Sequence, residues 1–83
     1  MEEKVSYVLD VLEKIRADVM LPRSARNLVN LAIQELKKEG DIKMKAASAV
    51  SHLDKAGNDP NLPPHIRTGI WSVLSVLESL TRE

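Results

Sequence analysis

The amino-acid sequence predicts an all-α protein that folds as an antiparallel up-and-down four-helix bundle. Three observations lead to this prediction. Apolar residues recur at helical spacing in four segments, no stretch alternates with the period of a β-strand, and turns rich in proline, glycine or asparagine separate the segments. With 83 residues the chain can bury one hydrophobic core, so we expect one domain over residues 1–83.

The first two helices are expected over residues 2–19 and 22–39. The apolar stripe of the first consists of Val8, Leu9, Leu12, Ile15 and Val19. Pro22 separates the two helices, because proline disrupts a helix interior but suits a first helical turn. Gly40 is expected to end the second helix as a left-handed cap.

The last two helices are expected over residues 41–56 and 63–81. Asp41 is placed to cap the first of them, and residues 58–63 form the longest loop because they hold two prolines, two asparagines and an aspartate. The strongest apolar face belongs to the last helix and consists of Ile66, Ile70, Val73, Leu74, Leu77 and Leu80.

The two halves of the chain resemble each other at an offset of 41 residues. Seven identities fall within about thirty positions: Leu12 with Leu53, Lys14 with Lys55, Asp18 with Asp59, Leu21 with Leu62, Pro22 with Pro63, Arg26 with Arg67, and Leu36 with Leu77. Each half, residues 1–39 and 41–83, is interpreted as a helical hairpin that cannot bury its apolar face alone. Stacking the two hairpins face to face gives the bundle.

Each hairpin turn contains an aspartate before a helix and an arginine about one turn into it. These pairs are Asp18 with Arg26 and Asp59 with Arg67. We expect them to form charge-assisted hydrogen bonds that fix each turn, with a binding role as the alternative.

Two stretches of the sequence are similar to uncharacterised protein family 0147, a family of small archaeal proteins. They are Ile-Arg-Ala-Asp-Val-Met-Leu-Pro-Arg at residues 15–23 and Asp-Pro-Asn-Leu-Pro-Pro-His-Ile-Arg at residues 59–67. The resemblance covers nearly the full length and implies a four-helix bundle and an archaeal source. It implies no activity, and no catalytic or binding residue is carried over from it.

Composition excludes several kinds of chemistry. Cysteine is absent, which rules out thiolate catalysis and cysteine-ligated metals, and the formal net charge is zero. His52 and His65 lack a partner at metal-ligand spacing, and neither a nucleophile elbow nor a phosphate-binding loop is present. We therefore expect no enzyme, cofactor, metal or membrane partner. Because no basic leader precedes an apolar stretch, we expect a cytoplasmic location.

Five apolar residues lie away from the predicted core stripes. They are Tyr7, Val11, Leu31, Trp71 and Val76. Trp71 lies about 120° from the centre of its helix's stripe at about 100° per residue. Aromatic residues at a surface are typical of interface anchors, so we expect a protein–protein interaction module, with a homodimer as one form.

The alternative hypothesis is nucleic-acid binding through a lysine group. Lys37, Lys38, Lys43 and Lys45 fall within nine residues around the central turn. They could contact phosphate, although neighbouring carboxylates dilute their charge and no aromatic residue is interleaved to stack on bases.

Overall fold

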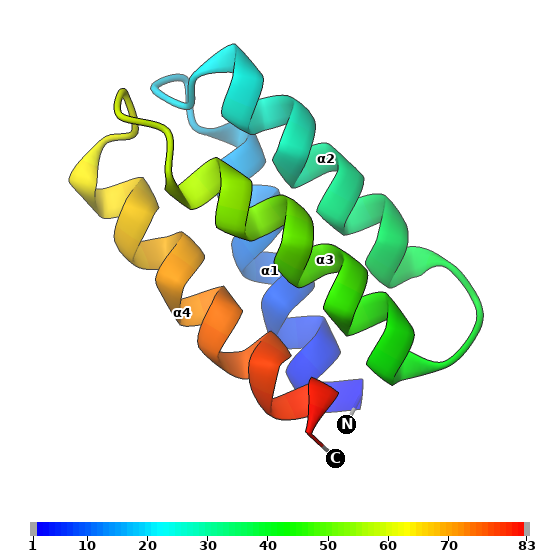
Figure 1. Cartoon of the computed structure of the whole chain (residues 1–83). Helices are drawn as coiled ribbons and strands as arrows, with labels where there is room; N and C mark the ends of the chain where they lie inside the picture. The colour runs from blue at the N-terminus through cyan, green and yellow to red at the C-terminus, as the bar shows by residue number, and fades with distance from the viewer. Residues whose placement is uncertain (1, 83) are drawn as a thin grey trace.

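The computed structural model describes residues 2–82 and contains four helices. They are α1 (Glu2–Ala17), α2 (Arg23–Lys37), α3 (Ile42–Gly57) and α4 (Pro64–Thr81). Each helix packs against its two neighbours in the ring α1–α2–α3–α4. Both hairpin turns lie at one end of the bundle, and the α2–α3 loop lies at the other end with the start of α1 and the end of α4 (Figure 1). The predicted four-helix fold is confirmed.

The core consists of aliphatic side chains from all four helices. The largest fully buried side chains are those of Leu12, Leu53, Ile66, Ile70, Leu77, Leu80, Val8, Val29 and Val73. α3 contributes Ala46, Ala49 and Ala56, each 0% exposed, and these small side chains let neighbouring helices approach closely. Accordingly α3 packs extensively against both α2 and α4, whereas α1 packs less extensively against its neighbours.

The first helix is shorter than the sequence predicts. α1 ends at Ala17, and the next residues form a tight turn in which the Leu21 N–H donates to the Asp18 carbonyl at 3.1 Å. Val19, which was expected on the apolar stripe, is 93% exposed, and Met20 is 60% exposed. The prediction for Val19 is wrong because the helix that would have turned it inward stops two residues earlier.

The central loop also differs in detail from the prediction. α2 ends at Lys37 because Lys38 has extended backbone, so Gly40, with φ of 130°, lies within the loop and does not cap α2. The predicted cap of α3 is confirmed, since Asp41 Oδ1 accepts the Lys43 N–H at 2.9 Å.

Candidate interaction surfaces

Arg26 and Arg67 hold the two hairpin turns through backbone carbonyls. The Arg26 guanidinium donates to the carbonyls of Arg16, Asp18 and Leu21. Arg67 makes the equivalent bonds 41 residues later, to the carbonyls of Gly57, Asp59 and Leu62. Each arginine therefore satisfies acceptors at the carboxyl end of a helix and in the following turn. In the predicted pairs Asp18–Arg26 and Asp59–Arg67, the arginine donates to the backbone carbonyl of the aspartate.

The aspartate carboxylates connect the two hairpins to each other. Asp18 Oδ2 lies 2.8 Å from His65 Nε2 in the first turn of α4, and Asp59 Oδ2 accepts the Ser24 hydroxyl of α2 at 2.9 Å. Ser24 and His65 are also 41 residues apart, so the two links are reciprocal. The His65 imidazole and then the Met20 N–H hold the pKa of the Asp18 carboxyl below its usual range.

Three of the five predicted interface residues are exposed, and the structure separates them. Tyr7 is 47% exposed on α1, Leu31 is 42% exposed on α2, and Trp71 is 58% exposed on α4. α2 and α4 do not contact each other, so Leu31 does not share a surface with Trp71.

The sequence predicts Val11 and Val76 as surface residues, but the structure covers both of them in part. Both are partly buried and pack against the core. On α1, the Lys4 ammonium donates to the Ser79 hydroxyl of α4 at 3.4 Å, so this side of α1 faces α4. Val11 lies two turns further along the same side and is therefore covered in part by α4.

The solvent-facing side of α4 carries no charge over a long stretch. None of the ten residues at 68–77 is charged. The exposed members of this stretch are Thr68, Trp71, Ser72 and Ser75, and we call them the α4 outer face. Arg67 reaches α3, so Trp71, one turn later, borders the α3 side of this face. Tyr7, one turn beyond Lys4, borders its α1 side.

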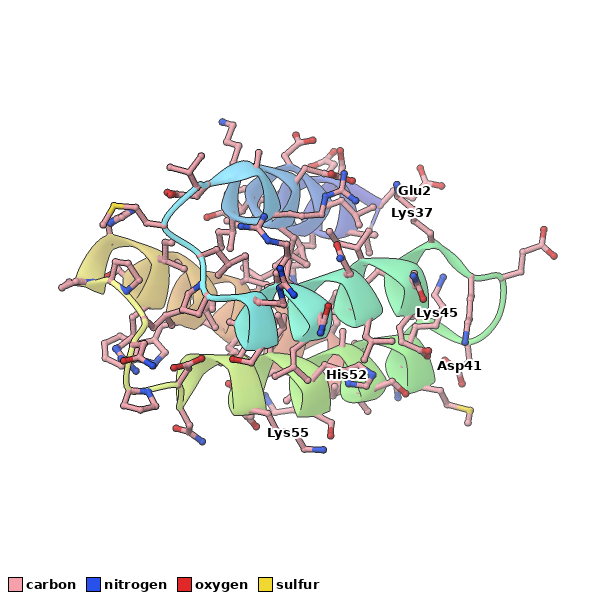
Figure 2. The ribbon with its side chains drawn as sticks, turned by 90° about the horizontal axis from the view of Figure 1, so that it is seen from above. Glu2, Lys37, Asp41, Lys45, His52 and Lys55 are labelled. Carbon is pink, nitrogen blue, oxygen red and sulfur yellow. The ribbon has the colours of Figure 1, made fainter. Side chains whose placement is uncertain are left out.

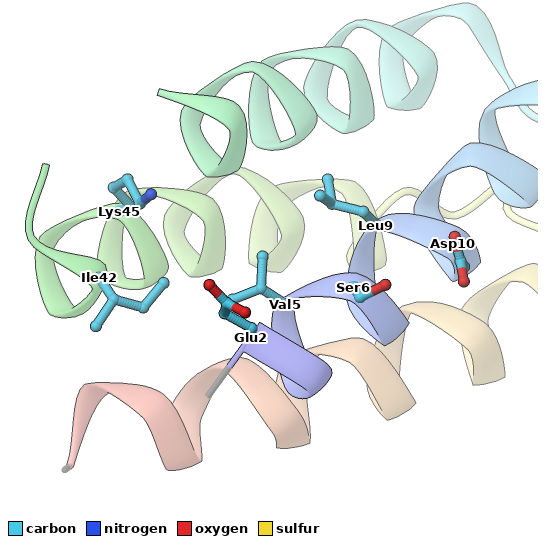
Figure 3. Close-up of a pocket in the computed structure, with 7 residues that line it drawn as sticks. All are labelled: Glu2, Val5, Ser6, Leu9, Asp10, Ile42 and Lys45. Atoms are coloured by element: carbon cyan, nitrogen blue, oxygen red, sulfur yellow. The ribbon is translucent and has the colours of Figure 1, made fainter. Parts of the chain in front are cut away.

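An apolar groove with a volume of about 480 Å³ lies on the side of α1 that faces away from the α4 outer face. Its lining consists of Glu2, Val5, Ser6, Leu9 and Asp10 from α1 and Ile42 and Lys45 from α3 (Figure 3). Val5, Leu9 and Ile42 are partly buried against the core and form its apolar floor. We call this feature the α1 groove.

No side chain of α2 lines the α1 groove. Its lining comes from the first half of α1 and from the start of α3, just after the central loop. The apolar side chains there remain open to solvent, and no signal within α1 alone indicates this.

The lysine group is interleaved with carboxylates. Lys38 pairs with Glu35 at 2.8 Å, and Lys37 lies 3.5 Å from Glu13. Lys45 donates to the Lys38 carbonyl at 2.7 Å. Figure 2 shows Glu2, Lys37, Asp41 and Lys45 at the same end of the bundle, so both signs of charge meet there. This arrangement suits a solvated charged end better than a phosphate site.

The described residues show no site for a metal ion, because no three of their histidine, aspartate and glutamate side chains come together. His65 is exposed and linked to Asp18, and His52 is half-buried on α3. No helix within residues 2–82 combines the length and apolarity needed to cross a membrane.

Comparisons with known proteins agree on one family. The family model of the uncharacterised protein family UPF0147 matches residues 1–80. The chain is 42% identical over 79 residues to a UPF0147 protein of Methanosarcina mazei, covering 94% of this chain and 85% of that protein. It is 38% identical over 76 residues to one of Archaeoglobus fulgidus, covering 92% and 87%.

A solved structure has the same fold. The crystal structure of the unknown function protein MMP1188 matches with a TM-score of 0.87 at 34% sequence identity, covering 94% of this chain and 90% of that one. Sequence and fold agree over nearly the whole length. This chain belongs to the uncharacterised protein family UPF0147.

Proposed function

We propose that the protein is a cytoplasmic, non-enzymatic interaction module that forms a homodimer through the α4 outer face. The observation that carries this proposal is an indole that is 58% exposed within a ten-residue stretch without charge. Interface centres are depleted of charged residues and enriched in Trp and Tyr, whereas solvated helices usually carry charges.

A second copy is the partner that this face suits best. A charge-free surface pairs with itself without like-charge repulsion, and it offers a charged partner no counter-charge. In a two-fold arrangement the small hydroxyl side chains of Ser72 and Ser75 allow two α4 helices to approach closely. The Trp71 ring of each copy then packs beside the serines of the other.

Sedimentation equilibrium tests the dimer over about 10 µM to 1 mM protein. The wild type should associate through the α4 outer face as its concentration rises, and Trp71→Ser, which loses this contact, should associate less than the wild type at every concentration in this range. Leu31→Ser is the matched control, because it removes another exposed apolar side chain from a helix that does not contact α4. It should dimerise like the wild type.

Two results would contradict the proposal. A wild type that remains monomeric throughout the range shows that the α4 outer face does not self-associate. Dimerisation that survives Trp71→Ser but disappears in Leu31→Ser places the contact on α2 instead.

A further inference from the structure

Two apolar features of the surface take no part in the proposed dimer, and they lie at opposite ends of the bundle. The first is the protruding turn after α1, where Val19 is 93% exposed and Met20 is 60% exposed. We call these two residues the turn tip. The second is the α1 groove, whose floor is formed by Val5, Leu9 and Ile42. One feature presents unburied apolar side chains, and the other is a concave apolar space that the chain leaves unfilled.

The charges around the two features have opposite sign. The charged residues that line the groove are Glu2, Asp10 and Lys45, which together carry a net charge of −1. Residues 18–26, which contain the turn tip, carry two arginines, Arg23 and Arg26, and one aspartate, Asp18, a net charge of +1. Because the whole chain has no net charge, repulsion between copies does not oppose their contact.

We propose that the turn tip of one copy inserts into the α1 groove of a second copy. Val19 and Met20 would then lie on the apolar floor. Arg23, exposed at the start of α2 beside the tip, would approach one of the two carboxylates at the groove rim, Glu2 or Asp10. This contact is heterologous: the copy that supplies the tip keeps a free groove, and the copy that supplies the groove keeps a free tip, so the contact extends from copy to copy.

The volume and shape of the groove are compatible with this occupant. The groove is open along about two turns of α1, from Glu2 to Asp10, and its volume of about 480 Å³ accommodates two aliphatic side chains. Two hydrogen bonds constrain the backbone of the turn tip: the Met20 N–H donates to Asp18 Oδ1 at 2.9 Å, and the Leu21 N–H donates to the Asp18 carbonyl at 3.1 Å. A constrained backbone loses less conformational entropy when the tip inserts.

The test separates this contact from dimerisation through α4 by using Trp71→Ser as the parent protein. The tip variant adds V19S and M20S, and the groove variant adds E2K and D10K. All four positions are exposed, so both variants should keep the fold, as circular dichroism can verify. Sedimentation velocity is measured for the parent, each variant alone, and an equimolar mixture of the two variants.

The expected results follow because the turn tip and the α1 groove are complementary. The parent should form species that grow beyond two copies with concentration and shrink with added salt. Each variant alone should associate at least about tenfold more weakly than the parent. In the mixture, the intact tip of the groove variant can enter the intact groove of the tip variant, so association should return and stop at two copies.

Three outcomes would overturn the proposal. A parent that stays monomeric up to about 1 mM shows that the tip and groove do not associate. Variants that associate as strongly as the parent show that another surface is responsible. A mixture that remains as monomeric as its components shows that the two features do not bind each other. The dimer proposed through α4 is tested separately, by the difference between wild type and Trp71→Ser.

Discussion

Replacing Arg26 or Arg67 by methionine should destabilise the bundle more than any other single change at its surface. Each guanidinium bonds three backbone carbonyls at the end of a helix and in the turn after it. Methionine keeps most of the aliphatic stem but leaves these carbonyls without their donor. The comparison therefore isolates the hydrogen bonds.

The expected magnitude comes from the net value of charged hydrogen bonds, which is about 1.5–3 kcal/mol each. Water can replace part of the lost bonding, because both arginines are only half-buried. We therefore expect a loss of about 2–3 kcal/mol for each variant. The two arginines share no partner, so the double variant should lose about 4–6 kcal/mol, comparable with the whole stability of a small domain.

Urea unfolding followed by circular dichroism measures these losses. Arg23→Met is the control, because Arg23 is exposed at the start of α2, and its change should stay within about 0.5 kcal/mol. Lysine at position 26 or 67 should rescue only in part, since a single ammonium cannot reproduce the planar guanidinium. If both methionine variants unfold within about 0.5 kcal/mol of the wild type, the turns do not depend on these bonds.

Other predictions concern the turns, the loops and the core. The lowered pKa of Asp18 means that its bonds stabilise the fold above the ordinary carboxyl pKa of about 3.9, and that this stability is lost as pH falls through the folded pKa. Asp18→Asn should thus lower the melting temperature near neutral pH but converge with the wild type in acid, and a constant difference from about pH 2 to 7 would contradict this. Gly40→Ala should cost about 1 kcal/mol because φ is 130° there, whereas Gly57→Ala should gain up to about 0.5–1 kcal/mol, since its Cβ would sit 3.5 Å from Ile70 in ordinary contact. Thermal unfolding of the two glycine variants would reveal shifts of opposite sign, and shifts of equal sign would refute the assignment. Leu53→Ala should cost about 2–5 kcal/mol in urea unfolding, because Leu53 is 0% exposed, and a cost below about 1 kcal/mol would show that the core collapses around it.

Helix number and order could be predicted because they depend on local patterns. Apolar residues at helical spacing and the turn residues between them are visible in any window of the sequence. The exact ends of the helices are harder to predict from the sequence. At the end of α1 the Arg26 guanidinium donates to the Arg16 carbonyl from ten residues away, and Val19, beyond this end, lies in solvent instead of on the expected core stripe.

The surface features depend on how the helices are placed relative to one another. A helical wheel correctly predicted that Trp71 avoids the core, but it could not show that Leu31 faces away from α4 or that Val11 is partly covered by it. The links from Asp18 to His65 and from Asp59 to Ser24 join residues far apart in sequence. Only the packing of the two hairpins brings them together.

An isotope-filtered nuclear Overhauser experiment on an equimolar mixture of labelled and unlabelled protein tests the central claim most directly. If α4 pairs with itself, the Trp71 indole protons of one copy should show intermolecular contacts with Ser72 and Ser75 of the other. Absence of any intermolecular contact from Trp71 at concentrations where the protein sediments as a dimer would contradict the account.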